Sequence, residues 1–405
     1  MTASLPQSRL IAPLAVFAAV LAAMVVLNHG TTSPPALSAA GVRDYAALGN
    51  TFLTRARETG DPGYYSRAGR AFKAALRRDP ASVGGLVGAG ALAGLRHDFR
   101  EQLRLGREAS SVAPQLASPL TVIADAQIEL GRYGDARRTL QRLVDIKPGL
   151  PAYARVSYYR ELHGDLGSAA EAMGFAISAG GGAESSAYVE SLLGDIELMR
   201  GRLGPARTAY REALRDVPSF PQALTGLARL DAAGGDLPRA AARLRRSTDR
   251  LPLTTSLVLL AEVEHALGRR RAANGDLAAA RVQHRLLGTN GTRPDAEAVL
   301  FEANHGSAAQ AVRLGRRVWR AAPSIRSADA LGWALTRAGR PSAGLAWARR
   351  ALRTGSRDPL FSLHAGVAAR SSGRVGQAER YLTAAVRGAA ALSPGSRRVL
   401  REARS

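Results

Sequence analysis

The stretch LLGDIELMRGRLGPARTAYREALRDVP, from Leu192 to Pro218, decides the fold. Both of its halves have the apolar spacing of an amphipathic helix, and a glycine lies between them. Two small residues, Gly194 and Ala206, lie inside these helices, although glycine in a helix costs about 1 kcal/mol against alanine. We therefore expect the two helices to cross at Gly194 and Ala206, with Tyr210 and Leu193 filling the space between neighbouring units.

Pro218 ends the second helix, since proline has no N–H and disfavours helix at the residue before it. The same ending recurs at intervals of 34 residues, at Pro80, Pro114 and Pro148 and again at Pro218 and Pro252. Twelve residues before this position stand Ala68, Ala136, Ala206, Ala240 and Ala311. A glycine marks the middle turn of the units, at Gly131, Gly201, Gly235, Gly339 and Gly373. Each unit is thus predicted to be two antiparallel helices joined by a short turn.

This pattern resembles the tetratricopeptide repeat (TPR), which has a period of 34 residues. The resemblance rests on LLG at 192–194, Ala206, Tyr210, Ala213 and Pro218, and on stretches such as LGRYGDARRTLQRLVDIKP. It covers residues 42–390. It implies an all-α fold, a right-handed TPR superhelical solenoid of about ten helix-turn-helix units, with residues 391–405 as a C-terminal capping helix. TPR arrays usually bind extended peptides along their concave surface.

An apolar segment lies near the N-terminus. After a tail of residues 1–9, residues 10–27 carry no charge, and this run is long enough to cross a bilayer as a helix. It is predicted to be a transmembrane anchor, with a cleaved signal peptide as the alternative, and residues 28–41 form a linker. Arg9 precedes the run and Arg43 is the first charge after it, so the positive-inside rule places the rest outside the cytoplasm. The sequence therefore favours a bacterial TPR protein at the cell membrane with an extracytoplasmic array, or a secreted one.

The composition limits the chemistry and the partners. The formal net charge is +23, which favours anionic partners such as a membrane surface or an anionic polymer. Aromatic residues make up only 5%, so base stacking has little support and nucleic acid is an improbable partner. There is no cysteine, which excludes disulfides, thiolate metal sites and cysteine nucleophiles.

The sequence contains no pattern typical of a catalytic site. It has no G-x-S-x-G, H-E-x-x-H or P-loop lysine motif. Two E-x-x-H spacings occur, Glu262 with His265 and Glu302 with His305, but a di-iron bundle site needs further glutamates converging from other helices. We interpret these pairs as polar residues near helix ends. We therefore expect that the chain is not an enzyme and that it binds no cofactor or metal.

The repeat register predicts which residues face the concave groove. The fifth residue after the central packing position of each first helix is the most groove-facing, and this series reads Asp125, Tyr158, Asp195, Arg229, Trp333 and Val367. Together with Glu129, the two aspartates make the middle of the groove acidic, which suits a basic or amide-rich segment. The series has no asparagine, so the carboxylate-clamp subtype of TPR is disfavoured. An ordinary hydrated groove wall is the alternative interpretation.

A second series is basic. Seven residues before each terminal proline, or its equivalent, stand Lys73, Arg107, Arg211, Arg245, Arg316 and Arg349. Stacked units would align them as a basic ladder on the convex side, where each charge at an anionic membrane contributes on the order of 1 kcal/mol. A solvated helix face is the alternative.

Three function classes follow from these observations. The favoured one is a non-catalytic protein–protein interaction scaffold of the cell envelope that binds partner segments in the concave groove. The second is a basic solenoid that binds an anionic polymer or an anionic membrane surface through the ladder. The third, an enzyme with an unrecognised site, has no stretch of about a hundred residues left to hold it. The oligomeric state is left open.

Overall fold

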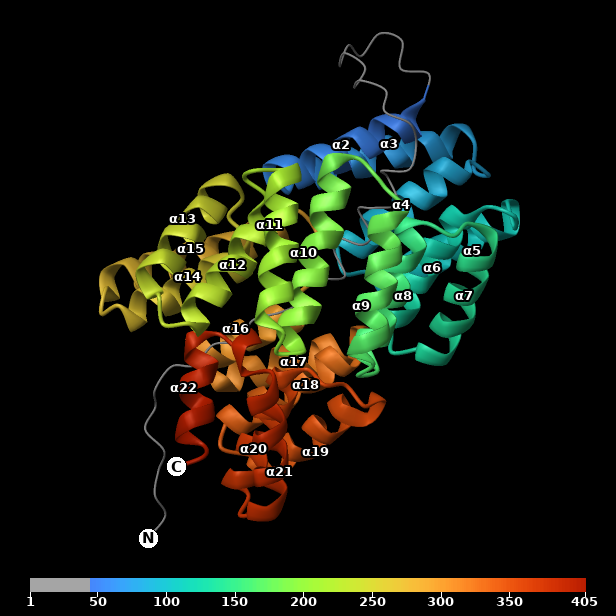
Figure 1. Cartoon of the computed structure of the whole chain (residues 1–405). Coiled ribbons are helices and arrows are strands. Elements are labelled where there is room, and N and C mark those ends of the chain that lie inside the picture. Colours follow the sequence, from blue (N-terminus) through green and yellow to red (C-terminus); the bar gives the residue numbers. More distant parts are fainter. Residues whose placement is uncertain (1–43) are drawn as a thin grey trace.

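The computed structural model describes residues 44–405, which form 21 α-helices and no strand (Figure 1). The predicted tail, anchor and linker, residues 1–41, lie outside the described residues. Within 44–405, none of the helices has the length and apolar character needed to span a bilayer. The all-α class and the helical repeat are confirmed.

Twenty of the helices form ten consecutive pairs. The first helices of the units are α2 (Tyr45–Thr59), α4 (Val83–Leu95), α6 (Ala117–Glu129), α8 (Leu150–Leu162), α10 (Ala183–Met199), α12 (Pro221–Ala233), α14 (Thr254–Ala266), α16 (Ala296–His305), α18 (Ile325–Arg337) and α20 (Pro359–Ser371). The second helices are α3 (Gly63–Arg78), α5 (Phe99–Val112), α7 (Tyr133–Ile146), α9 (Leu166–Ser178), α11 (Leu203–Asp216), α13 (Leu237–Arg250), α15 (Arg270–Thr289), α17 (Ala308–Ala321), α19 (Pro341–Ala351) and α21 (Val375–Arg387). A last helix, α22 (Pro394–Glu402), follows.

The small residues of the repeat make room for one large ring. A Cβ added to Gly194 would stand 2.4 Å from Cε1 of Tyr210, and one added to Gly226 would stand 2.2 Å from the same atom. Tyr210 is therefore held between the first helix of its own unit and that of the next. Ala206 is fully buried, as expected, but the close approach to Gly194 is made by Tyr210. Phe72 lies in the same way between Gly49 and Gly88.

The middle turns are built by glycines in the left-handed region of backbone space. All five glycines that the sequence placed at these turns have positive φ, and Gly131 at 67° and Gly235 at 88° are the extremes. This conformation suits glycine because a Cβ would meet the following carbonyl. The predicted register of the repeat is therefore correct at these turns.

The solenoid closes on itself. The hydroxyl of Tyr133 accepts a hydrogen bond from the backbone N–H of Ile325 at 2.9 Å, and Thr354 donates to the carbonyl of Leu162 at 2.7 Å. Each of these contacts joins residues 192 apart in the sequence. With a unit of 34 residues, one superhelical turn thus takes between five and six units. The later units, from α16 to α21, lie beneath the turns of the green helices (Figure 1).

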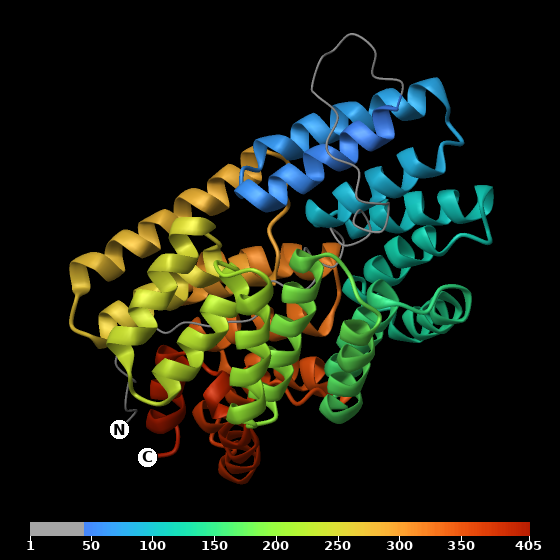
Figure 2. The same ribbon diagram turned by 45° about the horizontal axis from the view of Figure 1, so that its top comes forward.

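The two ends of the array also dock against its middle. Arg250 donates to the carbonyl of Glu58 at 3.0 Å, which ties the first unit to the sixth. In Figure 2 the blue helices of the first unit meet the end of the golden α15. At the other end, the backbone N–H of Gly395 in α22 donates to Glu262 of α14 at 2.9 Å. Helix α22 therefore covers the end of the array and also fastens it to unit seven.

Candidate functional site

Most of the predicted groove residues join one unit to the next. Asp125 on α6 accepts two hydrogen bonds from Arg155 on α8, at 2.8 and 2.9 Å. Asp195 on α10 accepts one from Arg229 on α12, at 3.1 Å. In each pair a carboxylate of one first helix meets a guanidinium of the following first helix, one repeat later.

The Asp125–Arg155 pair is deeply buried. Arg155 is 0% exposed and Asp125 is 7% exposed. Burial raises the pKa of Asp125, while the charge and hydrogen bonds of Arg155 lower it. The bidentate geometry fixes both side chains, because the planar guanidinium fork matches a carboxylate. Both oxygens of this carboxylate are engaged by Arg155 in the closed array.

Glu129 and Tyr158 belong to a second buried group, to which a later unit contributes. The hydroxyl of Tyr158 donates to Glu129 at 3.0 Å, and the guanidinium of Arg326 on α18 lies 5.4 Å from the Tyr158 ring centroid. Arg326 is also 3.9 Å from Glu161 on α8. Burial raises the pKa of Glu129, and it raises the pKa of Glu161 to about 8 although Arg326 opposes the shift. The second superhelical turn therefore supplies the cation for carboxylates of the first.

Trp333 is likewise part of the inner wall. Its indole N–H donates to Asn304 on α16 at 2.8 Å, and its ring stacks on His364 of α20 with centroids 4.2 Å apart. His364 in turn lies 2.9 Å from Asp329. Val367, the last member of the predicted series, is half-buried against the cores of the eighth to tenth units.

These positions correct the expected picture of the groove. We expected Asp125, Glu129 and Asp195 to form an acidic wall open to a partner. Asp125 and Glu129 are buried, Asp195 has a side chain only 16% exposed, and all three accept hydrogen bonds from neighbouring units. The physical reason is that the compact superhelix brings the first helices together and fills this part of the lumen. Direct partner contact by these residues stays a prediction.

A cavity of about 740 Å³ remains open elsewhere in the ring. It lies between the first unit, the long helix α15 and α16, within the 300–1,000 Å³ range of ligand pockets in proteins. Its apolar walls include Leu53, Leu95, Leu253, Leu287 and Phe301. Eight of the lining residues, between Leu53 and His97, come from the first two units, and the others come from Gln222 onward, mostly from the seventh and eighth units. The cavity therefore exists only because the solenoid closes.

The charged groups that line the cavity are mostly used within the protein. Arg57 forms an ion pair with Glu184 at 3.1 Å, and Arg293 forms one with Asp98 at 2.5 Å. Arg281 donates to the carbonyl of His305 at 2.9 Å. The pairing leaves little net charge available to a ligand, despite the basic character of the chain.

Two polar groups of the cavity wall have no partner within the described residues. The side-chain oxygens of Gln222 and Thr292 are buried without a hydrogen bond. Leaving such an atom unpaired costs about 1–3 kcal/mol, so a ligand that offers a donor is favoured. His284 lies edge-on to Phe301, with ring centroids 5.0 Å apart, and burial lowers the pKa of His284.

Sequence reasoning missed the cavity because its lining residues are far apart in the chain. One signal was present: residues 288–294 (GTNGTRP) interrupt the repeat and lengthen one unit. In the structure α15 extends to Thr289, and Arg293 of the following loop donates its backbone N–H to the carbonyl of Arg96 at 2.9 Å. The inserted loop thus forms part of the closure beside the cavity.

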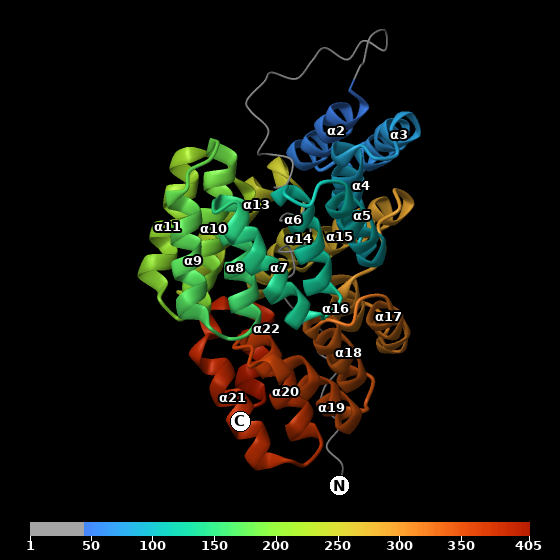
Figure 3. The same ribbon diagram turned by 90° about the vertical axis from the view of Figure 1, so that its right-hand side faces the viewer.

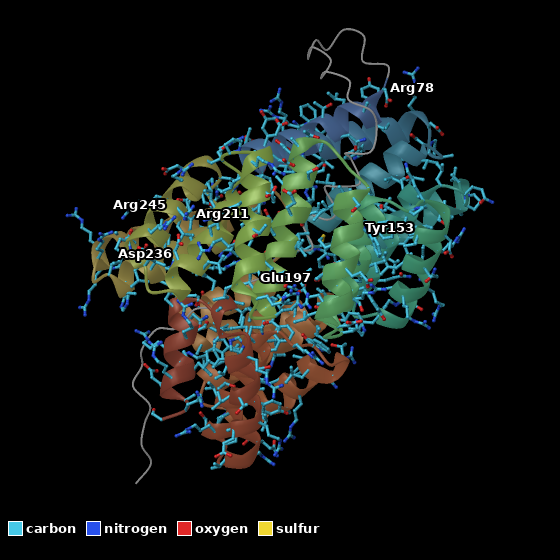
Figure 4. The ribbon with its side chains drawn as sticks, in the orientation of Figure 1. Arg78, Tyr153, Glu197, Arg211, Asp236 and Arg245 are labelled. Carbon is cyan, nitrogen blue, oxygen red and sulfur yellow. The ribbon has the colours of Figure 1, made fainter. Side chains whose placement is uncertain are left out.

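The six residues of the predicted basic ladder are all exposed, and all lie on second helices. Arg211 and Arg245, from the neighbouring helices α11 and α13, can be followed in Figure 4. The row is interrupted, because the equivalent positions of the third and fourth units hold Gln141 and Gly174. Arg245 is paired with Glu264. The six residues therefore do not form one continuous row but three separate pairs from consecutive units. In one of these pairs the charge of Arg245 is neutralised by Glu264.

The two E-x-x-H pairs lie apart, on α14 and α16. Glu262 accepts its hydrogen bond from α22, and Glu302 accepts one from the backbone N–H of Ser307 at 2.8 Å. Over residues 44–405, no three His, Asp or Glu side chains are grouped as a metal site would need.

No protein-family model matches the sequence, and no curated protein matches it. Three solved structures of TPR-type proteins are similar to the chain. A chain of the APC/C hetero-tetramer Cut9–Hcn1 has 15% identity and a TM-score of 0.38, with 89% of this chain and 65% of that chain covered. The human IFIT1 dimer with PPP-AAAA has 15% identity and a TM-score of 0.47, with 77% and 72% covered. MamA has 18% identity and a TM-score of 0.33, with 40% and 93% covered.

The chain spans less than two thirds of the Cut9–Hcn1 chain that it matches. Its own helix pairs, 34-residue period and glycine turns define it as a helical-repeat array, which is consistent with a TPR-like fold.

Proposed function

We propose that the protein is a non-catalytic interaction scaffold of the cell envelope that binds an extended, largely apolar segment of a partner protein in the 740 Å³ cavity. The cavity is the single observation that carries the proposal. It is the part of the concave lumen that the protein's own side chains leave open. The binding surface thus moves from the middle of the groove to the junction of the first unit with the seventh and eighth.

The wall chemistry supports a peptide-like occupant. Leucine side chains and Phe301 offer apolar surface against which an extended apolar segment can pack. Because Asp295, Glu297 and Glu302 nearly balance the four arginines of the lining, a strongly charged segment gains little here.

The envelope setting rests on the sequence. The length and apolar character of residues 10–27 support an anchor, and the flanking charges favour an array outside the cytoplasm. Secretion after cleavage of this segment is the alternative for localisation.

Selection of binders from a random peptide library tests the proposal, with the full chain in detergent micelles as bait. We expect apolar, uncharged sequences to be enriched. Filling the cavity with Thr255→Trp should weaken their binding at least about tenfold, by steric exclusion. Ala346→Trp, which adds the same ring to an exposed position of α19, is the matched control. Binding that survives Thr255→Trp unchanged would remove the cavity from the account.

A further inference from the structure

One region of the outer surface is basic because a stretch of the sequence there is rich in arginine and poor in acidic residues. Between Ala303 and Arg357 the chain carries eleven arginines and a single acidic residue, Asp329. Asp329 is 1% exposed and faces His364 inside the array. The exposed surface of these 55 residues, which include α17 and α19, therefore carries positive charge with no carboxylate of its own.

Helix α17 concentrates this charge on one side. Its four arginines, Arg313, Arg316, Arg317 and Arg320, follow the i, i+3, i+4, i+7 spacing that places side chains on one helix face, and all four are exposed. On α5, Arg100, Arg104 and Arg107 follow the i, i+4, i+7 spacing and are exposed as well.

Closure of the solenoid joins the two stripes. Arg100 of α5 donates to the carbonyl of Arg320 at the end of α17 at 3.0 Å, across 220 residues of sequence. Figure 3 shows α5, α17 and α19 one below another. Two members of the interrupted ladder, Arg107 and Arg316, thereby belong to one surface, although they come from the second and the eighth unit.

A cavity of about 490 Å³ lies where α5 meets the linker between α17 and α18. Its lining contains no acidic residue and consists of Leu103, Leu130, Pro323 and four arginines, Arg100, Arg104, Arg107 and Arg132. Arg104 also forms ion pairs with Glu101 and Glu108, at 2.6 and 2.8 Å. Arginine binds phosphate well because its fork of N–H donors matches two phosphate oxygens.

Two of the three tryptophans of the chain lie on the same side. Trp319 of α17 and Trp347 of α19 meet edge to face with ring centroids 4.8 Å apart. The guanidinium of Arg350 lies 5.4 and 5.0 Å from the two rings. Both tryptophans are half-buried, with an apolar body and a polar edge, as is typical of residues at a membrane–water interface.

We propose that this surface docks the array on a membrane that contains anionic phospholipids, with a headgroup phosphate in the 490 Å³ cavity. We call it the basic face and define it by Arg100, Arg104, Arg107, Arg132, Arg313, Arg316, Arg317, Arg320, Trp319, Trp347, Arg349 and Arg350. The tryptophans favour lipid over nucleic acid, because the two half-buried rings meet edge to face and do not form the stacking platform that a base needs. The basic face is outside the ring and the peptide cavity is inside it, so this proposal and the proposed function fail separately.

Tryptophan fluorescence of the full chain in reconstituted vesicles tests the docking. The vesicles contain brominated phosphatidylcholine, alone or with about 30% phosphatidylglycerol, so that the arms differ in surface charge only. Bromine quenches rings that reach the bilayer, whereas Trp333 stays buried in the lumen as a constant background. We expect quenching in vesicles that contain phosphatidylglycerol and none with phosphatidylcholine alone. In 0.5 M salt the quenching should be lost, because the screening length falls to about 4 Å.

Two triple variants decide whether the basic face is responsible. Arg313→Gln/Arg316→Gln/Arg317→Gln should shift the docking equilibrium about 100-fold and abolish quenching, since each charge contributes about fivefold. Arg67→Gln/Arg70→Gln/Lys73→Gln removes three exposed charges from α3 and should leave quenching intact. Arg100→Gln/Arg107→Gln should weaken docking about 25-fold, because it removes two charges from the phosphate cavity.

Three outcomes would overturn the proposal. The first is equal quenching in both vesicle types, and the second is an equal loss with the α3 variant. The third is displacement of the basic face from the vesicles by a single-stranded oligonucleotide or by polyglutamate. In that case the protein would bind the polymer more tightly than the vesicles, and the α17 variant would abolish the polymer binding. That result would assign the basic face to an anionic polymer instead.

Discussion

The ring of Tyr210 lies against the backbone of Gly194 so closely that a methyl group at position 194 would stand 2.4 Å from Cε1 of the ring. On its other side the ring meets Gly226 of the next unit in the same way. Real Cβ atoms essentially never approach a heavy atom this closely, so one of the three elements would have to move. The two glycines are the sequence feature that lets a large ring connect two units.

Gly226→Ala should therefore lower the stability of the array. The overpacked ring is expected to cost roughly 1–3 kcal/mol, more than the gain of up to about 1 kcal/mol from replacing a helical glycine. The midpoint of thermal unfolding, followed by circular dichroism, measures the effect. Gly174→Ala is the control, because Gly174 lies within α9 with no atom in reach of a new Cβ. That variant should be stabilised; a matching loss there would show that the ring contact is not the cause.

The pair of Asp125 and Arg155 should behave as a buried ion pair. Arg155→Met leaves a buried carboxylate without its cation and should cost about 3–5 kcal/mol. Asp125→Leu leaves the guanidinium unpaired and should cost a similar amount. The double variant should be less destabilised than either single one, since it removes both charges. A double-mutant cycle in urea measures this coupling, and additive losses would contradict it.

The structure also explains which features the sequence could predict. Repeat length, helix pairs and glycine turns depend on neighbours within one unit, and the positive φ of Gly131 and Gly235 follows from that local pattern. The pairing of Asp125 with Arg155 also had a local signal, because an acid and a base stand 30 residues apart on successive first helices. The burial of the predicted groove residues was not foreseen, and their contact with a partner stays a prediction.

Burial depends on how tightly the superhelix coils. The small rotations between successive units add up over five or six units, and their total determines whether Arg326 lies close to Glu161. No short-range sequence pattern determines this total rotation. The closure also determines which substitutions can serve as probes. Asp125→Arg would place a second cation beside the buried Arg155, so it would test stability rather than partner binding.

Glu262 should make the docking of α22 sensitive to pH. Burial raises the pKa of Glu262 to about 8, although hydrogen bonds from Ser393 and Gly395 oppose the shift. The ordinary value in an unfolded chain is about 4.3, so between about pH 4.5 and 8 the folded protein binds more protons than the unfolded one. Its stability must then fall as pH rises through this window. Glu161 contributes in the same direction, because its pKa is also raised to about 8.

Hydrogen exchange of the α22 amides between pH 5 and 8, corrected for intrinsic rates, measures this effect. Glu262→Gln should flatten the pH dependence of opening at α22, because the amide accepts from Gly395 without titrating. Glu171→Gln, on the exposed side of α9, is the control and should keep the slope of the unmodified protein. An unchanged slope in Glu262→Gln would assign the pH dependence to other groups.

Gly164 should be essential for the contact between superhelical turns. It has φ of 75°, and an added Cβ would stand 2.0 Å from the carbonyl oxygen of Gly355 in the next turn. Gly373 has φ of 73° with no atom in reach of an added Cβ. Alanine at either position takes on the strain of a left-handed residue, about 1–2 kcal/mol, but only Gly164→Ala must also push the turns apart.

Spin labels at Glu171→Cys and Arg357→Cys measure that separation directly, because the chain has no native cysteine. Both positions are exposed, on either side of the contact. We expect the Gly164→Ala variant to give a longer and broader distance distribution, and Gly373→Ala to give that of the parent protein. Since the peptide cavity exists only in the closed array, Gly164→Ala should also weaken binding of the selected peptides. A longer distance with undiminished peptide binding would mean that closure at this point and formation of the cavity are independent.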